Sequence, residues 1–103
     1  MEFRKELYLG EEAEKHYLEY RNALKRGKPY PELYAITYAV GEGDQLDIVN
    51  GMMLTIKSVR ERLPQIVGIA KGKEEALKVV RRIAEETFRA TGTCDMRAYL
   101  SRL

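Results

Sequence analysis

One junction in the chain has the glycines and lysines that phosphate-binding loops use. Gly68, Lys71, Gly72 and Lys73 lie where an apolar run passes into a long amphipathic stretch. A P-loop needs a longer spacing between its glycines and a serine or threonine after the lysine, whereas Glu74 follows Lys73 here. Backbone N–H groups at the start of a helix can still bind an anion beside the two lysines. We predict a simple strand-to-helix turn, with a small anion site as the alternative.

The single histidine and the single cysteine have no partner in the sequence that would activate them. We expect His16 to lie on the surface of a helix, because no second histidine or carboxylate pair accompanies it. We expect Cys94 to be a small buried thiol, because nothing in the sequence pairs it with a base. These patterns favour a non-enzymatic protein, with no metal and no cofactor, over an enzyme.

Acidic residues and tyrosines gather in the first half of the chain. The segment 29–56 has four acidic residues and no lysine or arginine, and six of the seven tyrosines precede residue 40. The acids lack the spacing of a calcium loop. Tyrosine is enriched at protein interfaces, so we predict a protein-binding surface, with packing at the rim of the core as the alternative. The predicted partner-binding residues are Tyr34, Tyr38, Glu42, Asp44 and Asp47.

The second half of the chain is basic. The segment 57–103 has eleven lysines and arginines against six acidic residues, a charge that suits contact with a nucleic-acid backbone. The tyrosine-rich strand has no basic residue between its aromatics, which disfavours the stacking mode of RNA-binding sheets. The residues that this alternative predicts for anion or nucleic-acid contact are Lys71, Lys73, Arg81 and Arg82.

Length and composition predict one domain that spans residues 1–103. A chain of 103 residues with 45% hydrophobic content can bury one core but not two. One cysteine cannot form an internal disulfide, which suits a reducing compartment. No apolar run approaches the roughly 20 residues of a membrane span, so we expect a cytoplasmic protein without membrane contact.

Periodicity and turn residues predict an α+β fold. The expected elements are a helix (11–27), a strand (33–40), a second strand (46–50), a short helix (52–63), a third strand (66–70) and a long helix (73–91). A single helix over 45–62 is the alternative to the hairpin and short helix. We expect a small antiparallel sheet of about three strands, in the order 2-1-3, with helices packed on one face. Residues 1–9 would extend the first helix or form a mobile arm, and 93–103 a C-terminal tail.

The long helix has the clearest pattern in the chain. Its apolar and small residues recur from Ala76 to Thr91 at the spacing of one helical stripe, with charged residues opposite. The stripe predicts that Phe88 anchors the helix in the core, so that Phe88→Ala would cost roughly 3 to 5 kcal/mol.

Three segments resemble small uncharacterised proteins of Firmicutes genomes and their mobile elements. They are Leu63–Gly72, continued by Glu74–Leu77, then Ala90–Leu100, and Asp44–Ile48 upstream. The resemblance brings no established activity and no functional residues. It implies a context in which small proteins often bind a host protein, including as inhibitors of host defence.

Together these observations predict a small intracellular protein-binding module, an inhibitor or adaptor encoded by a phage or mobile element. The alternative is a regulator that contacts nucleic-acid backbone through the basic second half. A second alternative is a small ligand-binding protein or enzyme that uses Cys94 or the Gly72 turn.

Overall fold

In the part of the chain that the structure describes, the protein is a four-stranded sheet with helices on both faces. The computed structural model describes residues 1–40 and 45–102. The strands are β1 (Phe3–Leu9), β2 (Leu33–Tyr38), β3 (Leu46–Asn50) and β4 (Ile66–Lys71). The helices are α1 (Glu11–Lys15), α2 (Tyr17–Arg26), the 3-10 helix η1 (Gly51–Thr55), α3 (Lys57–Arg62), α4 (Lys73–Thr91) and α5 (Met96–Ser101).

The sheet is mixed, in the order β1-β4-β2-β3. The three predicted strands pair antiparallel in the predicted order, with Ile36 of β2 opposite Ile48 of β3 and Gly68 of β4. The expectation of a purely antiparallel, three-stranded sheet is wrong in one respect, because β1 adds a fourth strand parallel to β4. Tyr8 lies opposite Gly68 in that pair.

Residues 1–9 are neither a mobile arm nor part of a helix. Phe3, Leu7 and Leu9 of β1 pack against the core on one face of the sheet, while Arg4 is buried on the strand. Phe3, Leu7 and Leu9 lie at alternate positions of a strand, but Lys5 interrupts the apolar series, so the pattern was not recognised from the sequence. Pairing with the buried strand β4 supplies the hydrogen bonds that an isolated segment would lack.

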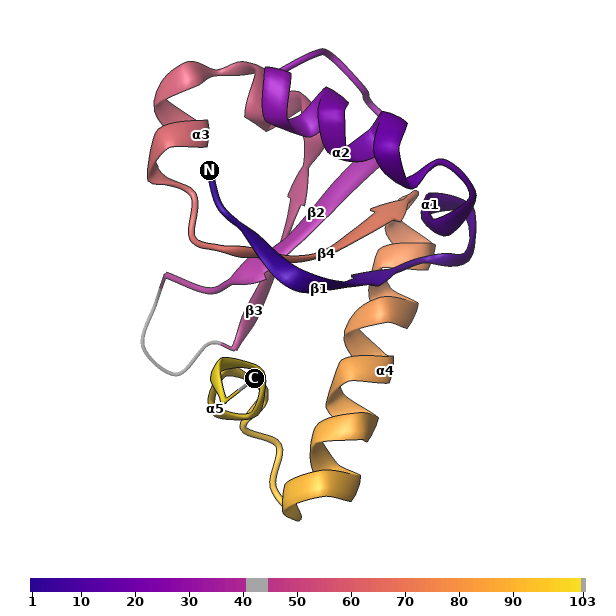
Figure 1. Ribbon diagram of the computed structural model, residues 1–103, viewed down its shortest axis with the longest axis vertical. Coiled ribbons are helices and arrows are strands. Elements are labelled where there is room, and N and C mark those ends of the chain that lie inside the picture. Colours follow the sequence, from indigo (N-terminus) through magenta and orange to yellow (C-terminus); the bar gives the residue numbers. More distant parts are fainter. Residues whose placement is uncertain (41–44, 103) are drawn as a thin grey trace.

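The expectation of helices on one face is also wrong. Figure 1 shows α2 and α3 above the sheet and α4 and α5 below it. Every residue from Ile66 to Ala70 is buried, so the central strand β4 is covered on both sides. One cluster contains Leu24, Leu33 and Ile69, and the other contains Ile36 and Ile83. A continuous apolar strand requires cover on both faces, which the expected single layer of helices did not provide.

The segments on either side of the hairpin follow the sequence prediction with small changes. The predicted first helix is broken at His16 into α1 and α2, and it ends at Gly27 in the left-handed conformation (φ 68°) that favours glycine. The hairpin prediction is confirmed over the single-helix alternative, because β3 pairs with β2 over its whole length. The following helix is divided into η1 and α3 at Ile56.

Helix α4 has the predicted length but a different rotation. Its buried residues are Ala76, Val79, Ile83 and Thr87. Phe88, predicted to be the core anchor, is 58% exposed, so that prediction is wrong. The apolar stripe is wider than the arc that contacts the sheet, and Phe88 lies at its outer edge.

The C-terminal segment is a helix rather than a tail. Asp95 caps α5 by accepting a hydrogen bond from the Ala98 amide over 3.0 Å, and Leu100 is buried under the sheet. Cys94, expected to be buried, is exposed in the connection between α4 and α5. His16 is exposed, as predicted.

Candidate functional site

An apolar flank of α4 is the candidate interaction site. Leu77, Val80, Ala84 and Phe88 recur at helical spacing along one side of the helix. Leu77 is 52% exposed and Phe88 58%, whereas Val80 and Ala84 are half-buried. We call these four residues the α4 apolar flank. All four belong to the apolar stripe that the sequence pattern predicts, and only the width of that stripe indicated that some of its residues would remain outside the core.

The opposite flank of α4 binds the sheet edge, which fixes the direction of the apolar flank. Arg82 Nη2 donates to the Leu9 carbonyl of β1 over 2.9 Å. Glu86 Oε1 accepts the Tyr8 hydroxyl of β1 at 2.7 Å and the Tyr99 hydroxyl of α5 at 3.0 Å. These bonds clamp one side of the helix, so the apolar flank faces away from β1.

Tyr8, Tyr99 and Glu86 form a hydrogen-bonded cluster that joins three elements. Burial, followed by the hydrogen bond to Glu86, raises the pKa of Tyr8 above its ordinary value. The same hydrogen bond is the main cause that raises the pKa of Tyr99. Both phenols therefore stay protonated as hydrogen-bond donors at neutral pH, and neither is a base. The cluster ties strand β1, helix α4 and helix α5 together.

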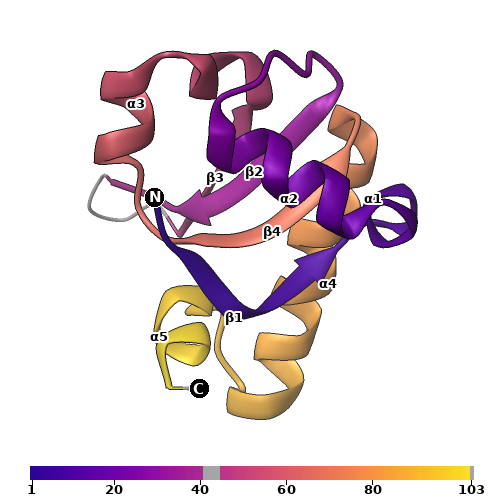
Figure 2. The same cartoon turned by 45° about the horizontal axis from the view of Figure 1, so that its top comes forward.

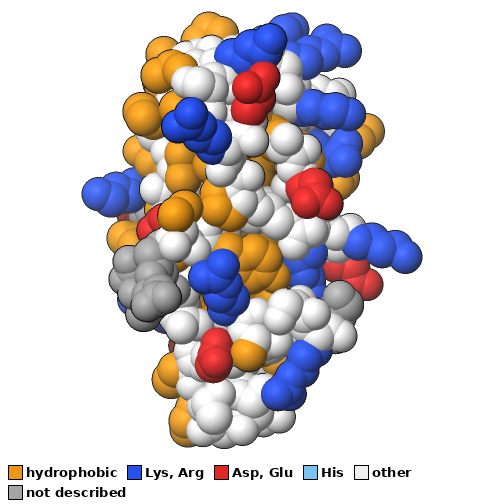
Figure 3. Space-filling view, turned by 90° about the vertical axis from the view of Figure 1, so that its left-hand side faces the viewer, with side chains coloured by type: hydrophobic (Ala, Val, Ile, Leu, Met, Phe, Trp, Pro, Cys, Tyr) orange, Lys and Arg blue, Asp and Glu red, His pale blue; other side chains and the backbone are white. Residues whose placement is uncertain are grey.

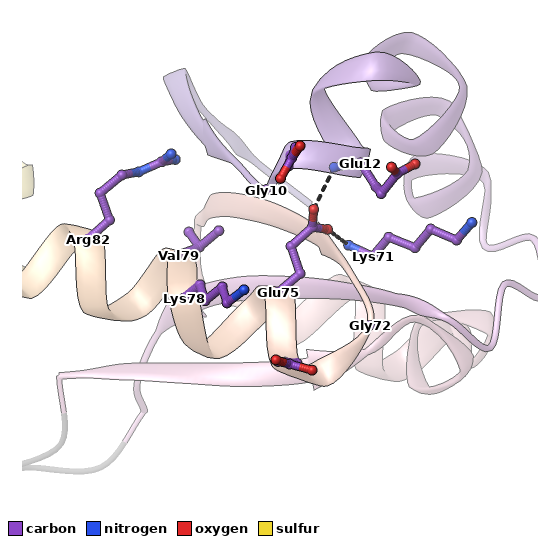
Figure 4. Close-up of a pocket in the computed structure, with 10 residues that line it drawn as sticks. Gly10, Glu12, Lys71, Gly72, Glu75, Lys78, Val79 and Arg82 are labelled. Carbon is purple, nitrogen blue, oxygen red and sulfur yellow. Dashed lines mark hydrogen bonds between the residues drawn. The ribbon is translucent and has the colours of Figure 1, made fainter.

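The Gly72 turn, predicted as a simple turn or an anion site, contains a carboxylate from the chain itself. Glu75 Oε1 accepts the Glu12 amide at 2.5 Å and Oε2 accepts the Lys71 amide (Figure 4). Gly72 adopts φ 84°, a conformation that favours glycine. A Cβ atom at Gly10 would overlap the Glu75 side chain, so glycine there makes room for the carboxylate. We call this contact the Glu75 latch.

The latch lies in a surface pocket of about 590 Å³ with charges of both signs. Lys71, Lys78 and Arg82 line it together with Glu12 and Glu75 (Figure 4). The Glu75 carboxylate already accepts the Glu12 and Lys71 amides, so an external anion at these amides would be repelled by it. Glu75 therefore connects α4 to α1 and β4 at this junction. This geometry gives no support to the prediction that Lys71 and Lys73 bind an anion.

The predicted tyrosine and acid residues are not all on one face. Tyr34 and Tyr38 are half-buried and pack on the side of the sheet that α4 covers. Asp47 pairs with Thr37, and successive side chains of a strand point to opposite faces, so Asp47 points away from these tyrosines. Glu42 and Asp44 lie outside the described residues. The partner-binding role of this set stays a prediction.

The four basic residues predicted for anion or nucleic-acid contact differ in their surroundings. Lys71 Nζ is 3.7 Å from Glu32, and Arg82 is bound to Leu9 as described above. Lys73 and Arg81 are exposed. Lys71 and Lys73 line one small surface pocket, together with the acids Glu12 and Glu32. Arg82 lies with Lys71 in the pocket of the Glu75 latch, and Arg81 lines neither pocket.

Two further searches concern the described part of the chain. Within residues 1–40 and 45–102, no group of three His, Cys, Asp or Glu side chains has a metal-binding arrangement. None of the helices there has the length and apolar composition that crossing a bilayer requires. Comparisons with protein-family models, curated proteins and solved structures found no match.

Proposed function

We propose that this protein is a non-enzymatic protein-binding module and that the α4 apolar flank is its contact surface. The observation that carries the proposal is the exposure of Leu77 and Phe88 on the longest helix. Exposed large apolar side chains that share one side of a rigid element are typical of interaction sites. Rigidity lowers the cost of ordering the surface on binding, and the bonds of Arg82 and Glu86 to the sheet edge supply it.

The charges beside the flank indicate the chemistry of the partner. Exposed Arg81 lies one helical turn after Leu77, and exposed Glu85 lies one turn before Phe88. Exposed Lys73 and Glu74 lie at the N-terminal end of the flank. A partner that presents apolar side chains bordered by charges of both signs would bury both leucine and phenylalanine and pair with these charged residues. We infer an amphipathic protein surface, with charges of both signs around its apolar side chains, as the partner.

The biological setting of this activity is a second part of the proposal. The resemblance of the sequence to mobile-element proteins suggests a host protein as the partner, so that binding would make this chain an inhibitor or adaptor. A cytoplasmic location would fit such a role.

Capture by variants with a disrupted flank tests the proposal. Tagged wild type and the double variant Leu77→Asp, Phe88→Asp are used to capture proteins from a lysate of the source organism, with quantification by mass spectrometry. We expect a specific partner to be depleted at least tenfold with the double variant, because two carboxylates on the flank disrupt its apolar contact. The matched control is Leu18→Asp, since Leu18 is 68% exposed on α2 on the other face of the sheet.

Two results would contradict the proposal. One is a partner that the double variant captures as well as wild type, with both proteins folded by circular dichroism. The other is tight binding of wild type to unrelated DNA duplexes at physiological salt, reduced by Arg81→Glu and unaffected by the double variant. That second result would favour the nucleic-acid regulator instead.

A further inference from the structure

A second pocket lies between the first half of β1 and helix α5. Its volume is about 600 Å³, within the range of small-molecule sites. Figure 2 shows β1 along the edge of the sheet with α5 beneath it. Arg4 and Lys5 come from β1, Tyr38 from the end of β2, and Leu100 from α5. Segments far apart in the sequence therefore form one pocket, which is separate from the α4 apolar flank.

Arg4 is the unusual residue of this pocket. It is only 8% exposed, although arginine is rarely buried without a charged partner. Its Nη1 donates to the Glu6 carbonyl of its own strand, and its guanidinium lies 5.7 Å from the centre of the Tyr8 ring. No ion pair joins Arg4 to an acid within residues 1–40 and 45–102. Several N–H groups of the guanidinium therefore remain for another acceptor.

The charges around Arg4 favour an anion as that acceptor. Lys5 lines the pocket as well, against one lining carboxylate, Glu6, which is exposed. Arg97 lies 5.7 Å from the centre of the Tyr38 ring and donates to the Ala39 carbonyl over 3.1 Å, so a second guanidinium is close by. Figure 3 shows one side of the molecule, on which basic and acidic side chains are both spread among apolar ones.

We propose that this pocket binds a small organic anion, a carboxylate or phosphate group attached to an apolar body. Arg4 would bind the anionic group, because a planar guanidinium matches two oxygens of either group. The body would lie against the Tyr38 ring and Leu100, and the Gln65 side chain at the pocket wall would supply a further polar contact. The proposal does not depend on the protein-binding function.

Chemical-shift titration of the intact chain tests the proposal. The probes are phenyl phosphate, phenylacetate and the uncharged benzyl alcohol, each added to 15N-labelled protein. We expect at least one anion to shift the amides of Arg4, Tyr38, Gln65 and Leu100 with a Kd of about 1 mM or tighter. Benzyl alcohol should shift them weakly, because it has no group for the guanidinium. The preferred anion tells a phosphate site from a carboxylate site.

Variants separate recognition by Arg4 from general attraction to a basic surface. Arg4→Lys keeps the charge but loses the planar fork, so we expect it to weaken anion binding about tenfold. Arg26→Lys makes the same change on the surface of α2 and should leave binding unchanged. Ser101→Leu, at the exposed rim of the pocket, should also weaken binding by filling it, and it keeps the test valid if Arg4→Lys unfolds.

Three results would overturn the proposal. The first is that neither anion shifts the amides at the pocket. The second is that benzyl alcohol binds as tightly as the anions. The third is that Arg4→Lys or Ser101→Leu, when folded, binds the anions as tightly as wild type.

Discussion

The rotation of α4 can be tested by two alanine substitutions on the same helix. Ile83 is fully buried beneath the helix, whereas Phe88, five residues later, is 58% exposed. The sequence pattern predicted that Phe88 was the anchor. The structure predicts the reverse order of importance, because the stabilisation from a side chain follows the apolar area that it removes from water.

The expected magnitudes follow from burial. Ile83→Ala removes a fully buried aliphatic side chain and leaves a cavity, which costs about 2 to 5 kcal/mol. A fully covered phenylalanine buries ~200 Å², so Phe88, with less than half of its surface covered, buries ~80 Å². At ~25 cal/mol per Å² this area is worth ~2 kcal/mol. Alanine retains part of it, so Phe88→Ala should cost about 1 kcal/mol.

Urea and thermal unfolding of both variants measure the difference. About 1 kcal/mol corresponds to a fall in Tm of roughly 4 to 8 °C for a domain of this size, and Ile83→Ala should fall at least twice as far. Similar slopes of the urea transitions would show that both variants unfold from the same native state. If Phe88→Ala is as destabilising as Ile83→Ala, the rotation of α4 is wrong and the α4 apolar flank is part of the core.

Three further predictions concern the latch, the tyrosine cluster and β1. Glu75→Gln should lower the free energy of unfolding by about 1 to 2 kcal/mol, because two backbone amides lose a charged acceptor. The control is Glu74→Gln at an exposed neighbouring residue. If both variants lower the stability in urea equally, the role of the Glu75 latch is refuted. The stability that Tyr8 contributes should be complete below pH ~10 and decline as the pH rises toward its raised pKa. Tyr8→Phe should therefore flatten the fall in stability at alkaline pH, and an unchanged slope would contradict the role of burial and Glu86. Deletion of residues 1–9 should abolish cooperative thermal unfolding, because it removes β1 and exposes β4, whereas a mobile arm could be removed without effect on Tm.

Local sequence was sufficient for most elements. The hydrophobic period of α4, the glycine that ends α2 and the β-branched and aromatic residues of β2 each act within a few residues of the chain. Such signals depend on backbone conformation and on which side chains share a face, so a sequence reading can find them. The antiparallel order of β3, β2 and β4 followed from the helical connection predicted between the second and third strands.

The candidate site was much less predictable. Leu77 and Phe88 belong to the same stripe as Ile83, and nothing in the local pattern says which part of a wide stripe meets the sheet. That choice depends on Arg82 and Glu86, whose partners on β1 and α5 are distant in the sequence.

What the sequence alone determined was therefore most of the local elements, with the exception of β1 and α5, and the apolar character of each. The tertiary structure decided the pairing of β1 with β4, the covering of both faces of the sheet, and the burial of Arg4 at the pocket between β1 and α5. The physical reason is that a helix or turn is stabilised largely by near neighbours in the chain. A strand edge, a helix rotation or a buried charge is instead stabilised by contacts that exist only once distant segments have packed together.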